Sequence, residues 1–139
     1  MNILLLEGDE STSRSLTHQL TDKGYKVFVA YNENKAIDVV LDNHIDLIIC
    51  DLIEPVLNGV SFLSTRGKFM SLRVPVIVLS SANSKQALKR LPIEIGFFME
   101  KPLQFNKLLD LVGQCELDQI LSGPLEEKPS LSHSNWIVQ

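Results

Sequence analysis

The sequence predicts an α/β fold, a single doubly wound sheet of five parallel strands with helices on both faces. Short apolar runs alternate with segments of helical periodicity along the chain. The runs are almost continuously apolar, which is typical of strands buried on both faces, whereas antiparallel strands show alternation. The 139 residues are enough for one domain with its own core.

The first predicted strand covers residues 3–6, and a helix over residues 11–23 follows it. This helix carries Leu16 and Leu20 on one face, and Gly24 comes directly after it as a stop signal.

The next two units repeat the pattern. A strand rich in β-forming residues is predicted over 26–31, a helix with one apolar stripe over 33–43, and a third strand over 46–50. A third helix is predicted over 60–70, although Gly67 weakens it.

The last two units complete the sheet. A fourth strand is predicted over 76–79, and a short helix over 84–91 ends at Pro92. The fifth strand covers 96–99, and a final helix runs from residue 105 to about residue 121.

Composition excludes several classes of protein. A net charge of −4 argues against non-specific nucleic-acid binding, which needs a basic face. No apolar stretch approaches the ~20 residues of a membrane span, and the N-terminus lacks the features of a signal peptide. Cys50 and Cys115 lie in apolar contexts and read as reduced core thiols. We therefore expect a cytoplasmic protein that binds neither membranes nor nucleic acid directly.

Two regions are predicted, a domain over residues 1–121 and a C-terminal tail or linker stub over 122–139. The tail is polar and contains two prolines from Pro124 onward, as linkers do. Trp136 is its obvious anchor if it docks, and an extended, undocked end is the alternative.

Polar residues follow four of the predicted strands. In open α/β sheets, ligands bind where the carboxyl ends of the strands meet. Two carboxylates, a hydroxyl and an ammonium are expected to converge there. They are Glu7 after the first strand, Asp51 after the third, Ser80 after the fourth and Lys101 after the fifth.

This set of groups suits phosphoryl transfer. A carboxylate can accept a phosphoryl group as an acyl phosphate, and a divalent cation and a lysine can balance the negative oxygens. Asp51 is the expected nucleophile and Glu7 helps to hold the cation. Ser80 and Lys101 are expected to hold the phosphoryl oxygens.

Four motifs resemble the receiver domains of bacterial two-component response regulators, over about residues 2–118. They are ILLLEGDE, DLIICDLIEPVLNG, PVIVLSS and FFMEKP. The resemblance implies a flavodoxin-like fold of strand order 2-1-3-4-5. It also implies a signalling domain that is not an enzyme. At most, such a domain catalyses its own slow phosphotransfer and dephosphorylation. Such a domain takes its phosphoryl group from a histidine kinase or a histidine phosphotransfer protein.

The resemblance assigns roles to single residues. Asp51 is the phosphoacceptor, and the backbone carbonyl of Ile53 joins it and Glu7 in binding Mg²⁺. Pro55 shapes the following loop and Gly59 opens the third helix.

Further roles follow for the last two strands. Ser80 is the switch hydroxyl, and Phe98 stands at the aromatic switch position. The Lys101-Pro102 bond is expected to be cis, which costs little before proline.

A downstream partner is expected to bind the face of the fourth helix, fifth strand and fifth helix. Met99, Glu100 and Gln104 are predicted to lie near this face, with Phe98 beneath it.

Three features depart from the family pattern. Gly8 stands where a second metal-binding acid is usual, so Mg²⁺ should bind weakly or not at all. Phe98 lacks the hydroxyl of the common tyrosine. The spacing from Ser80 to Lys101 is about one residue short and includes Pro92, which predicts a short or irregular fourth helix.

Position 8 leaves alternatives open. Gly8 could permit a left-handed turn into the first helix. Asp9 could replace the missing acid, although Asp9 or Ser11 is better placed as the helix N-cap.

Three other functions compete with a phosphorylated receiver. A pseudo-receiver would bind partners without phosphorylation, because the metal site is incomplete at Gly8. A flavodoxin-like cofactor binder is disfavoured, since the acids that follow the first strand would repel a phosphate. An aspartate-nucleophile phosphatase needs a second carboxylate at position 53, where the chain has isoleucine.

Overall fold

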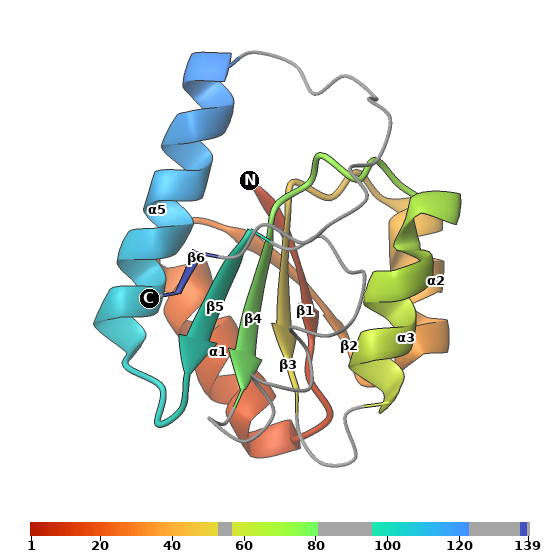
Figure 1. Ribbon diagram of the computed structural model, residues 1–139. Helices are drawn as coiled ribbons and strands as arrows, with labels where there is room; N and C mark the ends of the chain where they lie inside the picture. The colour runs from red at the N-terminus through yellow and green to blue at the C-terminus, as the bar shows by residue number, and fades with distance from the viewer. Residues whose placement is uncertain (53–56, 81–95, 123–136, 139) are drawn as a thin grey trace.

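The sheet is parallel throughout and buried on both faces. The computed structural model describes residues 1–139 except 53–56, 81–95, 123–136 and 139. Within that part, the sheet has six strands in the order β2-β1-β3-β4-β5-β6 (Figure 1). The strands are β1 (Asn2–Leu6), β2 (Lys26–Ala30), β3 (Leu47–Asp51), β4 (Val76–Ser80), β5 (Phe97–Glu100) and β6 (Ile137–Val138). The predicted order 2-1-3-4-5 is confirmed, and β6 is an addition.

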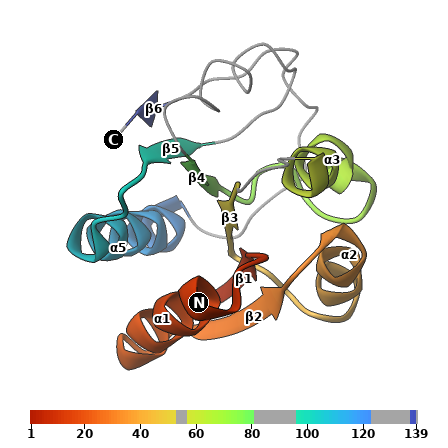
Figure 2. The same ribbon diagram turned by 90° about the horizontal axis from the view of Figure 1, so that it is seen from below.

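Helices lie on both sides of the sheet, with α1 and α5 on one face and α2 and α3 on the other (Figure 2). The helices are α1 (Glu10–Asp22), α2 (Glu33–Asp42), α3 (Leu57–Thr65) and α5 (Phe105–Ser122), with a 3-10 turn at Arg66–Lys68. The predicted helix over 84–91 lies outside the described residues.

Two apolar clusters make up the core, one on each face of the sheet. Successive residues of a strand point to opposite faces, so β3 supplies Ile48 and Cys50 to the α2/α3 side and Leu47 and Ile49 to the α1/α5 side. All five residues of β3 are buried, which explains its unbroken apolar run. Burying each such large side chain contributes about 1.5–3 kcal/mol.

The third helix differs from its prediction. It begins at Leu57 and ends at Thr65, and the next three residues form the 3-10 turn. Gly67 lies in that turn, where its poor helix propensity favours the tighter geometry. Gly59 belongs to the first turn of α3, where a Cβ would clash with the Leu52 side chain and lie 3.0 Å from Cys50 Sγ. A larger residue at position 59 therefore requires the Leu52 side chain to shift.

Both ends of α1 follow the sequence signals. Asp9 is the N-cap, and its Oδ2 accepts hydrogen bonds from Thr12 N at 2.9 Å and Thr12 Oγ1 at 2.6 Å. Gly24 follows the helix with φ of 90°, the left-handed conformation that glycine adopts easily. Among the described glycines a positive φ occurs at Gly24 and not at Gly8, so the left-handed turn suggested for Gly8 is wrong.

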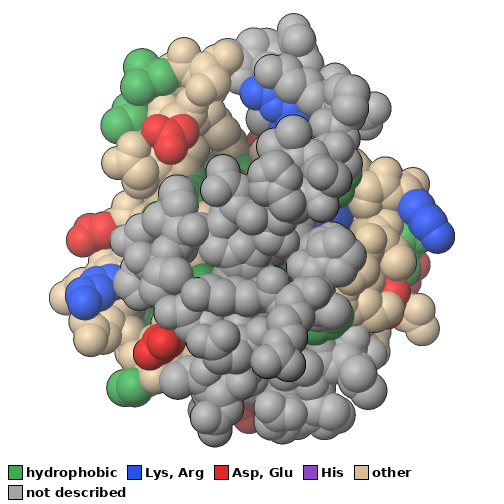
Figure 3. All heavy atoms as spheres, viewed as in Figure 1, with side chains coloured by type: hydrophobic (Ala, Val, Ile, Leu, Met, Phe, Trp, Pro, Cys, Tyr) green, Lys and Arg blue, Asp and Glu red, His purple; other side chains and the backbone are tan. Residues whose placement is uncertain are grey.

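The end of α5 exposes apolar side chains. Leu117, Ile120 and Leu121 are 48%, 72% and 76% exposed, and hydrophobic side chains are visible there in the space-filling view (Figure 3). These three positions share one side of the helix. In the described part of the chain, no helix is both long and apolar enough to span a membrane.

Replacing Asp9 by alanine should destabilise the protein by about 1 kcal/mol, since the first turn of α1 loses its cap. Urea denaturation monitored by circular dichroism measures this loss. Asp9→Asn is the control, because asparagine caps a helix about as well as aspartate. Equal destabilisation by both variants would show that the carboxylate charge matters and the cap does not.

Candidate functional site

The ends of four strands bring the predicted site residues together. Leu6, the last residue of β1, is paired with Cys50, so Glu7 and Asp51 follow on adjacent strands. Asp51 is in register with Leu79 of β4, and Ser80 is in register with Glu100 of β5. Because the strands pair in parallel and in register, the side chains that follow the apolar runs lie next to one another.

An ion pair between Lys101 and Asp51 spans this edge. Lys101 Nζ contacts Asp51 Oδ1, and the Asp51 side chain is 1% exposed whereas that of Lys101 is 31% exposed. The Lys101 N–H donates to the Ser80 carbonyl oxygen at 2.9 Å, which fixes the start of the lysine side chain beside β4. The Lys101-Pro102 bond is cis, as predicted.

Glu7 is a buried carboxyl group with an altered pKa. Only 1% of the residue is exposed, its N–H donates to the Ala30 carbonyl, and its Oε1 accepts the Asp9 N–H at 2.9 Å. Burial, and then the neighbouring Asp51 carboxylate, raise the pKa of Glu7 to about 8. The hydrogen bond from Asp9 and the charge of Lys101 act in the opposite direction. A proton therefore competes for this carboxyl group near neutral pH.

Two buried oxygens at the site have unused hydrogen-bonding capacity. Ser80 is fully buried, and neither Ser80 Oγ nor Glu7 Oε2 has a hydrogen-bond partner among the described residues. Buried polar atoms in native proteins are normally partnered, so these two suit a bound ligand, ion or water.

The donor set fits a magnesium ion only in part. Mg²⁺ needs oxygen ligands and accepts one or two carboxylates together with waters and phosphate oxygens, which Glu7 and Asp51 can supply. Gly8 adds no side chain, and the Asp9 carboxylate is engaged in capping α1. The described residues contain no cluster of three or more acidic, histidine or cysteine side chains suited to a metal. Ile53 and Pro55 lie outside the described residues.

The residues predicted for signal output differ in exposure. Phe98 is fully buried in the cluster on the α2/α3 side. Glu100 and Gln104 are exposed, as a contact surface requires. Met99 is only 4% exposed and packs in the α1/α5 cluster, so it offers little of its own surface to a partner.

One buried charged residue that the sequence analysis did not single out is Arg66. Arg66 is 2% exposed, and its guanidinium donates to the Leu63 carbonyl oxygen. Its charge opposes the rise in the pKa of the Cys50 thiol that burial causes. The TRGKF segment that contains Arg66 resembles an ordinary polar turn.

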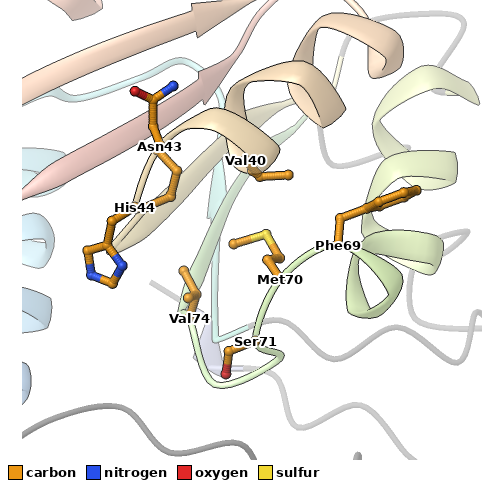
Figure 4. A pocket seen from close by; sticks show the side chains of 8 residues that line it. Val40, Asn43, His44, Phe69, Met70, Ser71 and Val74 are labelled. Atoms are coloured by element: carbon orange, nitrogen blue, oxygen red, sulfur yellow. The ribbon is translucent and has the colours of Figure 1, made fainter.

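A cavity of about 240 Å³ lies elsewhere (Figure 4). Its lining comes from the segments that precede β3 and β4, so it is at the amino ends of the strands, opposite the Asp51 edge. It is lined by Val40, Asn43, His44, Ile45, Phe69, Met70, Ser71 and Val74. This cavity is therefore separate from the candidate site.

Known proteins resemble the chain over most of its length. The "Probable transcriptional regulator ycf29" of Pyropia yezoensis is 30% identical over 121 residues, which cover 86% of this chain and 54% of that protein. The "Two-component response regulator-like APRR7" of Arabidopsis thaliana is 34% identical over 112 residues, covering 78% of this chain and 15% of that protein. The chain thus spans about half the length of the first relative and less of the second.

Solved structures share the fold. The chemotaxis protein CheY4 of Vibrio cholerae has a TM-score of 0.68 at 25% identity, with 82% of this chain and 97% of that chain covered. The receiver domain of the hybrid histidine kinase CckA has a TM-score of 0.67 at 24% identity, with 83% and 98% covered. The family model described as "Response regulator receiver domain" matches residues 3–113. The chain therefore belongs to the receiver-domain family of two-component response regulators.

Proposed function

We propose that this chain is a receiver that accepts a phosphoryl group on Asp51 and relays the signal by a conformational switch. The observation that carries the proposal is the ion pair of Lys101 with Asp51 beside two other buried polar groups, Glu7 and Ser80. The donor is a phosphohistidine of a histidine kinase or of a histidine phosphotransfer protein.

The transfer forms one bond and breaks one. An oxygen of the Asp51 carboxylate attacks phosphorus, and the bond from phosphorus to the donor nitrogen breaks as that nitrogen takes up a proton. The Lys101 ammonium then contacts a phosphoryl oxygen in place of the carboxylate. The Ser80 hydroxyl donates its free hydrogen bond to another phosphoryl oxygen, which couples the acceptor site to β4.

Magnesium would be held by Glu7, Asp51 and the carbonyl of Ile53, with Gly8 weakening the site. The ion supplies positive charge that offsets the three phosphoryl oxygens. Other activity of the domain is limited to slow self-catalysed phosphotransfer and dephosphorylation.

Output is proposed to use the surface around β5 and α5, together with the predicted fourth helix. Glu100 and Gln104 are the exposed residues of this surface that follow from the sequence. The proposed compartment is the cytoplasm, where histidine kinases present their phosphoryl group.

The second candidate is a pseudo-receiver that binds partners without phosphorylation. Two observations favour it. Gly8 leaves the metal site one acid short while Asp9 is committed to the helix cap. Lys101 already balances the charge of Asp51, so the site is close to neutral without a cation.

Labelling with acetyl phosphate and Mg²⁺ should add one phosphoryl group to the protein, and Asp51→Asn should abolish it because the acceptor oxygen becomes an amide. Intact-mass spectrometry measures the label, and circular dichroism shows that the variant is folded. Folded wild-type protein that never labels would favour the pseudo-receiver, and labelling that persists in Asp51→Asn would place the acceptor elsewhere.

Gly8→Asp should strengthen Mg²⁺ binding at least about tenfold and speed labelling of Asp51. A further carboxylate about 4 Å from the divalent ion attracts it by about 8 kcal/mol at an effective dielectric of about 20, which is about 4 kcal/mol for each of the ion's two charges. Desolvation offsets part of this gain, and tenfold corresponds to about 1.4 kcal/mol. Titration calorimetry with Mg²⁺ measures the affinity, and Gly8→Asn controls for the added side chain. Equal binding and labelling in wild type and Gly8→Asp would refute the role given to Gly8.

Affinity for Mg²⁺ should rise about tenfold between about pH 7 and pH 9. The carboxylate form of Glu7 binds the cation and the protonated form does not, so affinity increases as pH passes through the Glu7 pKa of about 8. Glu7→Gln should bind more weakly at every pH and lose this dependence. A wild-type affinity that stays flat over the range would contradict the assignment of Glu7 as a ligand.

A further inference from the structure

The outer edge of β5 is occupied by the far end of the same chain. Phe97 is in parallel register with Ile137, and Phe98 with Val138 (Figure 1). Without this pairing, β5 would be the last strand of the sheet and would present a row of unpaired N–H and C=O groups. Such an edge is a template for any extended chain that approaches it.

The covering strand is short and arrives through a long connection. β6 has two residues, and residues 123–136 separate it from the end of α5 at Ser122. A two-residue ladder offers few hydrogen bonds, and a parallel ladder is slightly less stable per residue than an antiparallel one. The contact is therefore one that a competing strand can displace.

A strand-binding site needs an open edge and, beside it, pockets for side chains. A groove lies beside the edge of β5. The groove has a volume of about 420 Å³ and is lined from β5 and α5. Phe97 and Leu111 supply apolar surface, while Lys107, Asp110 and Gln114 are exposed polar side chains. Phe97 belongs both to the groove and to the residues that pair with β6.

Recognition by strand addition uses these two features together. Main-chain hydrogen bonds to the edge supply affinity, and pockets for alternate side chains supply specificity. A strand that pairs with β5 directs every second side chain toward the α5 side of the sheet, where the groove lies. The lining favours an apolar side chain flanked by polar or charged ones.

We propose that the outer edge of β5 and the adjoining groove form an acceptor site for an extended, parallel strand. Its occupant in the isolated protein is the chain's own segment Ile137–Val138, bound within the same molecule. This segment keeps the site closed to extended segments of other proteins until it is displaced. The proposal does not depend on phosphorylation of Asp51.

The test uses the full chain with Ile137→Pro and Val138→Pro together, since proline has no N–H to donate to a ladder. The matched control is Ile137→Thr with Val138→Thr, which keeps both N–H groups and a β-branched shape. Amide hydrogen exchange followed by NMR should show at least tenfold faster exchange in β5 of the proline variant, with β1 and β3 unchanged. Exchange in β5 that is equal in wild type and the proline variant would overturn the proposal.

A synthetic peptide of residues 130–139 with an N-terminal fluorophore tests the acceptor directly. It should bind the proline variant at least tenfold more tightly than wild type, because an attached strand competes at an effective concentration on the order of millimolar. The threonine control should behave as wild type. Failure of the peptide to bind the proline variant would overturn the acceptor site. The alternative, in which β6 of one molecule pairs with β5 of a second copy, is tested by sedimentation. Wild-type dimers whose β5 amides lose their protection from exchange on dilution would overturn pairing within one molecule.

Discussion

Burial of a parallel sheet on both faces is the constraint on which the rest of this structure depends. Helices cover both sides, so β1, β3 and β4 are apolar along nearly their whole length. Polar side chains are then confined to the strand ends, and parallel pairing places those ends at one edge. The gathering of acids, a hydroxyl and an ammonium there follows from the architecture of the sheet.

Charge balance governs what this edge can do. Glu7 and Asp51 are buried side by side, and one ammonium, that of Lys101, lies next to them. Two adjacent carboxylates with a single positive partner favour a proton on one of them, which agrees with the raised pKa of Glu7. Under the proposed assignment, a magnesium ion would have to displace that proton, with no acid at position 8 to help it. The same residues are compatible with a receiver of weak metal dependence and with a pseudo-receiver. The difference between the two is how strongly a cation competes with the proton on Glu7.

β5 takes part in three separate features of the molecule. Its residue Phe98 fills the core on one face, its outer edge holds β6, and Lys101 comes immediately after it. The Lys101 N–H is bonded to the end of β4, so the lysine cannot shift far without moving both strands. The proposed strand site and the proposed acceptor site are therefore connected through the same short segment, β5.

The sequence alone determined the five core strands, the four side chains at their ends and the Gly24 stop, and it narrowed the cap of α1 to Asp9 or Ser11. Each rests on a local signal: an apolar run, the residue that follows it, or the chemistry of a helix end. The tertiary structure decided the rest. The sixth strand is an Ile-Val pair after a polar tail, and its pairing partner lies about forty residues away. The raised pKa of Glu7, the burial of Arg66 and the close approach of residue 59 to Leu52 and Cys50 all depend on neighbours from other elements. Distant segments set burial and contact, and no local pattern of residues records them.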